Sequence, residues 1–513
     1  MILNSGGADI AAKRADFLFL TFSMKITGVL LTLIKKIDGK LILTFSAGLT
    51  ATFITLMLTL NAVAAVLVFI LTIAGLIFYK SFSRGWIFLL GIVLLFPAIK
   101  LNDSGLTLFV FLLSVLALIG MIKLALEDKK IIKNRLTFHF FLFFLIAASY
   151  LIFGKLLGVE ISGEVWWIAL NLLLIWMLLI GFQYFFQTQR RIKMFFGAVV
   201  ATSTFHCLFG VVMYLSASQN SLGIGVTKDR FIHPIFGQLD YRLNGFLGFG
   251  LEDRVGSNFI SAFILAGLLL SVGFILDNLY REKYLSKKRK LHKEFFSVVD
   301  FFIKAIKGRG GKLFYKRLLL YLLAIIQFVG LFLTFSYYSL LYLGLGLLVM
   351  GVMLRRDKLI SLAVVYLMFF AVILPTLFSS GNVFFLQDNI NRIEYFQKPF
   401  FDWIFGVSLG RSDFSANETN NSYFLIWSVY GVAGLLLMIR MLWRYFAEIY
   451  KKYRNTVNGE RLWFVVATAI FGIFLLEGFS GNVLIFGPTA IIFWLMYGMI
   501  LNFGNVAFKK KVN

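Results

Sequence analysis

Apolar runs of about 20 residues recur along the whole chain, and this pattern limits what the chain can fold into. About fourteen stretches are long and apolar enough to cross a bilayer as helices. Strands of a membrane barrel would instead alternate polar and apolar residues over about 10 positions. The 513-residue chain is 60% hydrophobic and 15% charged, whereas soluble domains average about 25% charged residues. We therefore predict an all-α polytopic integral membrane protein with about 12–14 transmembrane helices.

Lysine and arginine in the loops predict the orientation of these spans. Residues 278–316 contain twelve Lys or Arg and three acidic residues, a net charge of +9 (12 − 3). The positive-inside rule therefore makes this loop cytoplasmic. Each successive span crosses the membrane in the opposite direction. When the spans are followed from this loop toward both ends of the chain, the other basic clusters also fall on the cytoplasmic side. Both termini are then cytoplasmic, and two long loops, 217–255 and 379–421, lie outside.

The predicted topology divides the chain into segments. These are an N-terminal cytoplasmic or interfacial segment (1–40), N-terminal transmembrane helices (41–216), a first outer loop (217–255), central transmembrane helices (256–378) with the basic cytoplasmic loop (278–316), a second outer loop (379–421), and C-terminal helices with a cytoplasmic tail (422–513). The predicted spans are 41–56, 62–79, 86–99, 105–126, 136–154, 164–186, 194–216, 256–277, 317–335, 339–354, 359–378, 422–443, 462–476 and 484–503. For residues 16–34, basic residues at both ends favour an interfacial helix over a further span.

Two other function classes are disfavoured by composition. A net charge of +25 is typical of nucleic-acid-binding proteins, but here the charge lies in short loops between spans, as topology requires. We therefore expect no nucleic-acid partner. The single cysteine, Cys207, lies in an apolar run, so it forms neither a disulfide framework nor a Cys-based metal site.

Three polar stretches in or beside the outer loops hold the residues that can carry chemistry. The first is Tyr241–Phe246, which continues to Glu252–Asn258. The second comprises Asn391–Tyr395 and Phe405–Arg411. The third is Asn420–Tyr423, which leads into an apolar run containing Gly431 and Gly434. Arginines on the outer side oppose the positive-inside rule, so they are more informative there than inside.

In their order and placement, these stretches resemble the O-antigen polymerase and O-antigen ligase family over roughly residues 230–440. Arg242, Gly245 and Asn258 match the family's first motif. Gly406, Leu409 and Gly410 match the second, and Asn421, Ser422 and Tyr423 match the third. The resemblance implies a GT-C-like membrane glycosyltransferase with no metal or cofactor. It implies an undecaprenyl-diphosphate-linked oligosaccharide as substrate, and a chain-length regulator and a flippase as partners in the bacterial inner membrane.

This chain departs from the family pattern at two positions, and one of them bears on the choice between polymerase and ligase. Ligases carry His before the Asn-Ser pair, where this chain has Asn420, and the family's Ser-Arg pair reads Ser336-Tyr337 here. Losing that His favours a polymerase over a ligase. From a different class, a lipid-linked oligosaccharide flippase would also have many spans, but it should show two similar halves and short loops. This chain has no such halves and two long outer loops.

Roles for the site residues follow from the resemblance and from the chemistry of a diphosphate. Guanidinium gives bidentate, permanently charged contacts to phosphate. We expect Arg242, Glu252 and Arg392 to be catalytic. We expect the substrate-binding residues to be Arg254, Asn258, Arg411, Asn420, Asn421, Ser422 and Tyr423.

Structural interpretations stand beside these roles. Each outer arginine could pair with a loop acid, and Asn420–Ser422 could cap a helix that begins near residue 422. Gly431 and Gly434 are expected at helix-packing positions. Glu252, Glu418 and Glu477 are the carboxylates available to an acceptor hydroxyl, and among them the sequence favours Glu252. Glu477, at the outer end of a span, is either functional or an interfacial turn residue.

The predicted topology can be tested by cysteine labelling. In a Cys207→Ser background, Arg289→Cys should stay unlabelled in intact cells treated with a thiol reagent that cannot cross the inner membrane. The physical reason is the net positive charge of loop 278–316, which retains it on the cytoplasmic side. Labelling at position 289 before the membrane is opened would overturn the whole assignment.

Overall fold

The computed structural model describes most of the chain from residue 81 onward. The described residues are 81–95, 108–127, 163–186, 188–215, 226–233, 237–243, 253–288, 312–379, 421–456, 458–479, 483–484 and 487–502, with scattered positions between 138 and 156. The chain divides into two units, residues 1–85 and residues 86–513. Only residues 81–85 of the first unit are described, so the architecture below is that of the second.

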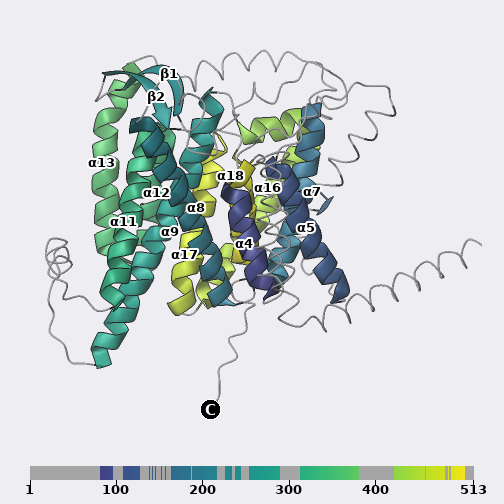
Figure 1. Cartoon of the computed structure of the whole chain (residues 1–513), viewed down its shortest axis with the longest axis horizontal. Helices are drawn as coiled ribbons and strands as arrows, with labels where there is room; N and C mark the ends of the chain where they lie inside the picture. Colours follow the sequence, from purple (N-terminus) through teal and green to yellow (C-terminus); the bar gives the residue numbers. More distant parts are fainter. Residues whose placement is uncertain are drawn as a thin grey trace, which may run out of the picture. The chain divides into compact units, whose positions relative to one another are not determined.

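The second unit is built from helices and one β-hairpin (Figure 1). The elements are α4 (Phe82–Leu95, which begins in the first unit), α5 (Leu108–Leu126), α7 (Gly163–Phe185), α8 (Gln189–Leu215), β1 (Val226–His233), β2 (Gly237–Leu243), α9 (Asp253–Lys288), α11 (Lys312–Leu333), α12 (Tyr337–Leu354), α13 (Asp357–Ser379), α16 (Ser422–Asn455), α17 (Asn458–Glu477) and α18 (Gly487–Asn502). Each helix overlaps one predicted span. The predicted spans 41–56 and 62–79 lie outside the described residues, and 136–154 is described only at scattered positions.

Two helices continue well beyond the predicted ends of their spans, by 11 (288 − 277) and 12 (455 − 443) residues. α9 continues to Lys288, beyond the predicted end at residue 277, and α16 continues to Asn455, beyond residue 443. Both extensions are rich in Lys, Arg, Glu and Tyr. Lys, Arg and Glu favour helix, so helical structure can continue after the apolar run ends. Hydropathy alone therefore locates the apolar run and not the end of the helix.

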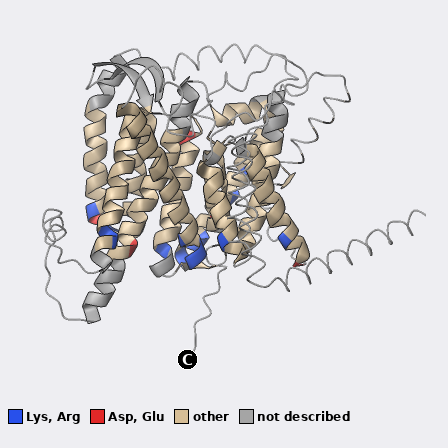
Figure 2. Cartoon of the chain, in the orientation of Figure 1, with Lys and Arg blue, Asp and Glu red and all other residues tan. Residues whose placement is uncertain are grey.

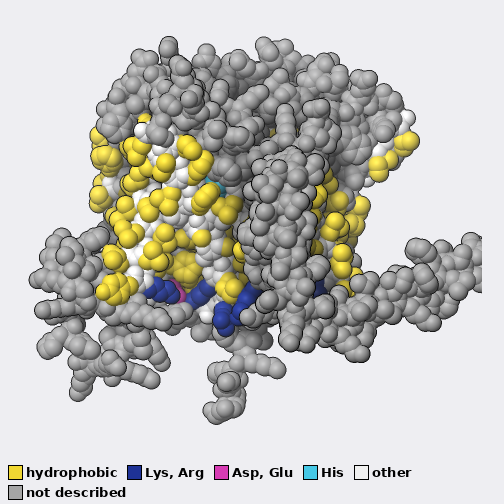
Figure 3. Space-filling view, in the orientation of Figure 1, with side chains coloured by type: hydrophobic (Ala, Val, Ile, Leu, Met, Phe, Trp, Pro, Cys, Tyr) yellow, Lys and Arg dark blue, Asp and Glu magenta, His cyan; other side chains and the backbone are white. Residues whose placement is uncertain are grey.

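Four helical segments among the described residues are long and apolar enough to cross a membrane. They lie in α8, α9, α11 and α12. One side of α11 exposes large apolar residues at helical spacing, including Tyr315, Leu319 and Leu322. A space-filling view shows apolar side chains spread over the described surface of the helices (Figure 3). These are the features of an α-helical membrane protein. The larger number of crossings remains a prediction.

α9 is the central helix of this unit. It contacts α8, α11, α12, α17 and α18. Its residues 260–270 are all buried, so no side of this stretch faces outward. Small residues recur along it, among them Ser261, Gly267 and Ser271, and small residues let neighbouring helices approach closely.

Close packing and polar contacts hold α8, α9 and α11 together. A Cβ added at Gly267 would lie 1.9 Å from Ser203 Oγ on α8. The buried Gln327 of α11 donates to Ser203 Oγ (2.7 Å), and its Oε1 accepts from Ser271 Oγ of α9 (2.7 Å). In lipid, burying apolar side chains gives little driving force for helix association. Close packing at small residues and hydrogen bonds between helices therefore stabilise the contact between α8, α9 and α11.

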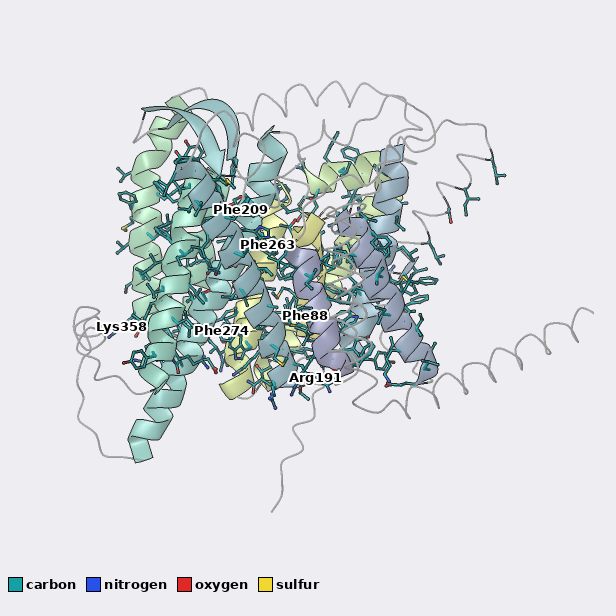
Figure 4. All side chains as sticks on the ribbon, in the orientation of Figure 1. Phe88, Arg191, Phe209, Phe263, Phe274 and Lys358 are labelled. Carbon is teal, nitrogen blue, oxygen red and sulfur yellow. The ribbon has the colours of Figure 1, made fainter. Side chains whose placement is uncertain are left out.

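Basic residues gather at one end of the helices, called the basic end here (Figure 2). Arg191 at the start of α8 and Lys358 at the start of α13 both lie there (Figure 4). Lys193 Nζ pairs with Asp277 Oδ2 at 2.9 Å, joining α8 to α9, and lies 5.2 Å from the Trp463 ring centre on α17. This asymmetry agrees with the loop charges from which the topology was predicted.

The β-hairpin lies within the predicted first outer loop and was not foreseen. β1 and β2 pair antiparallel, and they contact α8, α9 and α11. The fully buried Leu243, at the end of β2, packs against Gly210 of α8, where an added Cβ would lie 2.6 Å from Leu243 Cγ. Gly210 is near the end of α8 that lies away from Arg191. We call this end of the helices the hairpin end.

α16 is broken at Gly431, which corrects the expectation that this glycine is only a packing position. Gly431 has φ 63° and ψ −169°, so two helical pieces meet there at a kink. This backbone conformation is essentially restricted to glycine. Gly434, three residues later, also has to lack a side chain, because a Cβ there would lie 2.4 Å from Tyr430 Cβ.

Two glycines allow a matched test of the packing between α8 and α9. Gly267→Ala should lower the free energy of unfolding by about 2 kcal/mol, since the new methyl group collides with Ser203. Gly197→Ala on α8 should have little effect, because nothing lies within 4 Å of its added Cβ. Thermal unfolding in mild detergent measures both. Equal stability of the two variants would contradict the packing described.

Candidate functional site

The predicted site residues fall into three groups. Arg242 lies in β2 opposite Thr227 of β1, and Arg254 and Asn258 lie in the first turns of α9. For these three the backbone alone is described. Outside the described residues lie Glu252, Glu418, Arg392, Arg411, Asn420, Gly245, Gly406, Leu409 and Gly410. The side chains of Asn421, Ser422 and Tyr423 are described, and they form part of a connected site.

Asn421 caps α16. Its backbone is extended (φ −139°, ψ 116°), and its Oδ1 accepts from Tyr423 N (2.9 Å) and Phe424 N (3.0 Å). The capping interpretation of this motif is therefore confirmed. A cap also fixes the direction in which the chain arrives at the helix, so capping and substrate contact can coexist.

The segment Leu475–Phe479, at the end of α17, holds the third motif in place. Ser422 N donates to Gly478 O at 2.8 Å, and Tyr423 Oη donates to Leu475 O at 2.7 Å. The rings of Tyr423 and Phe479 lie 4.5 Å apart. Both accepting carbonyls belong to the last turn of α17 and its continuation, which lack partners within the helix. The start of α16 is thereby attached to the end of α17.

Glu477 is the last residue of α17, and its side chain is only 2% exposed. Its Oε1 accepts from Ser339 Oγ at 2.5 Å. Ser339 Oγ also lies 2.8 Å from Ser261 Oγ and 3.2 Å from Ser336 Oγ. We call Ser261, Ser336, Ser339 and Glu477 the hydroxyl–carboxylate cluster. It joins the hairpin ends of α9, α12 and α17 and the turn before α12.

Hydrogen bonding in part of the cluster is directed at the carboxylate. An ionised carboxylate can only accept, and a serine hydroxyl has one proton. When Glu477 is ionised, Ser339 therefore donates to it, and the oxygen of Ser339 can accept from Ser336, since either hydroxyl of that pair can be the donor. Ser261 is the alternative acceptor for the proton of Ser339. All three serines are buried, and Ser336 and Ser339 form a path directed at the carboxylate.

Helix dipoles act on Glu477 in opposite directions. A negative charge at the C-terminal end of α17 is unfavourable, whereas one beside the first turn of α12 is favourable. Ser336 precedes α12 with no side-chain capping bond, and Ser339 lies in the first turn. The carboxylate at the end of α17 is thus bonded to Ser339 in the first turn of α12. Glu477 is buried and is the last residue of α17, directly before the turn, and its functional role stays a prediction.

The sequence pointed to some residues of this site but not to the contacts between them. It singled out Ser336, Glu477 and Asn420–Tyr423 separately. Ser261 and Ser339 gave no signal, because serines within apolar runs are common and usually bond to their own helix. Among the described residues, no three His, Cys, Asp or Glu side chains come together in a group that could hold a metal ion. No model of a known protein family and no curated protein matched the chain.

The capping role of Asn421 predicts which substitutions are tolerated. Asn421→Ala should lower the free energy of unfolding by about 1 kcal/mol, because two backbone N–H groups lose their acceptor. Asn421→Ser should keep most of that stability, since serine also caps well. Unfolding in detergent measures both. A stable Asn421→Ser protein with impaired function would assign substrate contact to the amide as well, and an unchanged Asn421→Ala protein would contradict the capping role.

Proposed function

We propose that this chain is a membrane glycosyltransferase that polymerises lipid-linked oligosaccharides. It joins undecaprenyl-diphosphate-linked repeat units into an O-antigen, capsular or exopolysaccharide on the outer side of the bacterial inner membrane. The hairpin end of the helices is then the outer side. The residues that resemble the O-antigen polymerase and ligase family carry the site.

One observation supports this proposal above the others. The third motif (Asn421–Tyr423) and the Ser336 position, separated by more than eighty residues, are both bonded into the structure around the end of α17. Ser261, one turn after Asn258 in α9, belongs to the same cluster. Packing alone would not require that the third motif and the position of the family's Ser-Arg pair, where this chain has Ser336-Tyr337, converge. A common site at the hairpin end accounts for it.

The chemistry of the transfer matches the residues available. A new C–O bond forms between an acceptor hydroxyl and the anomeric carbon, and the anomeric carbon's bond to the diphosphate breaks with its electron pair leaving on phosphate. Arg242, Arg254, Arg392 and Arg411 would stabilise that charge. Glycosyl transfer also requires the acceptor to be oriented, and Asn420–Tyr423 at the start of α16 would do this.

A lipid-linked oligosaccharide flippase is the second candidate, and the break in α16 favours it. Interrupted helices line substrate sites in many transporters, as Gly431 would allow here. A ligase, which passes finished glycan to an acceptor such as lipid A-core, is the third. It is less favoured because Asn420 replaces the histidine that ligases carry.

The glycan that accumulates without the protein distinguishes these functions. A polymerase defect leaves single repeat units on the lipid carrier, exposed outside. A ligase defect leaves polymer on the carrier, and a flippase defect leaves repeat units facing the cytoplasm. Mass spectrometry of extracted lipid-linked glycans reads out the first two, and protection from an external glycosidase reads out the third. Either of the latter patterns would overturn the polymerase proposal.

Arg242→Lys should lose most polymerising activity while the protein level stays near normal, because an ammonium cannot replace the bidentate guanidinium contact. Arg289→Lys is the matched control and should be silent, since only its charge is needed for topology. Polymer length and amount on gels measure the effect. If Arg242→Ala made full-length polymer at the wild-type rate, Arg242 would be no more than a loop ion-pair residue.

A further inference from the structure

The hydroxyl–carboxylate cluster has a feature that packing does not require. A buried carboxylate in a membrane protein is costly, and such groups usually have functional roles. Gln327 and the hydroxyls that it bonds, those of Ser203, Thr204 and Ser271, are called the Gln327 cluster here. This cluster joins α8, α9 and α11 through neutral groups alone. Neutral polar groups therefore suffice for helix association in this protein. A carboxyl group at position 477 is therefore more than helix association alone requires.

The cluster also has a direction. Ser336 is the least deeply buried of its three serines, with 6% of the residue exposed, and it lies in the short turn between α11 and α12. Its Oγ lies 3.2 Å from Ser339 Oγ, which lies 2.5 Å from Glu477 Oε1. A continuous path of hydroxyls therefore leads from the turn to the carboxylate. Along such a path, each oxygen can pass on one proton as it receives another.

We propose that Glu477 is the positioning residue for the acceptor hydroxyl, acting through Ser339 and Ser336. This inference rests on the proposed glycosyl transfer. The acceptor hydroxyl donates a hydrogen bond to Ser336. As its oxygen bonds to the anomeric carbon and the diphosphate leaves with the bonding electron pair, its proton passes to Ser336. Ser336 then passes a proton to Ser339, and Ser339 passes one to Glu477. The cluster thus supplies the proton acceptor that Asn420 cannot be, in place of the Glu252 that the sequence favoured.

Two tyrosine hydroxyls bond to the carbonyls just before Glu477. Tyr342 on α12 donates to Leu476 O, and Tyr423 on α16 donates to Leu475 O. Among the described side chains, α9 contributes Ser261 to the cluster, and α18 contains no charged residue.

Purified protein acting on lipid-linked repeat units tests the inference. Glu477→Gln should lower kcat about 100-fold with KM unchanged, a loss typical of proton-transfer groups. Glu477→Asp, which keeps a carboxyl group on a shorter side chain, should recover part of kcat.

A matched pair of serines separates positioning from packing. Ser339→Ala and Ser271→Ala each remove one buried hydroxyl that donates to a side-chain oxygen, at 2.5 Å and 2.7 Å respectively. Both should lower the unfolding temperature, but only Ser339→Ala should lower kcat. Equal losses of kcat in the two, or a Glu477→Gln enzyme with the wild-type kcat, would overturn the inference. If Glu477→Gln fails to fold, Ser339→Ala and Glu477→Asp decide. Wild-type protein that forms no polymer would instead refute the proposed function.

Discussion

The hydrogen bond from Ser339 to Glu477 is the interaction on which the arrangement of the candidate site depends. Inside a membrane no bulk water satisfies a buried charge, so protein groups must do so. Ser339 does this from the first turn of α12, and it brings Ser261 and Ser336 with it. The carbonyls next to Glu477 receive the start of α16. One short segment at the end of α17 thereby fixes three helix ends.

α9 provides the rigid support for this arrangement. It is buried among five other helices, and the Gln327 cluster and the Lys193–Asp277 pair anchor it further along its length. Arg254 and Asn258 lie at its start, before Ser261. Sites built on rigid elements keep their geometry better than sites built on loops alone. The outer-loop arginines would then approach a surface whose shape is already set.

The sequence predicted the elements well and their connections poorly. Hydropathy located the helices because a membrane demands long apolar runs, and loop charges identified the basic end. The cap at Asn421 was foreseen because its chemistry is local. The Ser339–Glu477 contact joins positions 138 residues apart, and nothing in the local pattern of either residue indicates the other. The break at Gly431 and the β-hairpin were missed because one glycine, or one short polar loop, is compatible with many conformations.

A double-mutant cycle between Ser339 and Glu477 tests the central claim most directly. Turnover of lipid-linked repeat units is measured for wild type, Ser339→Ala, Glu477→Gln and the double variant. If the two residues act as one unit, the double variant should be scarcely slower than Glu477→Gln alone, a coupling of at least about 1 kcal/mol. Losses that simply add would show that the two side chains act independently, and they would contradict a site organised around this bond.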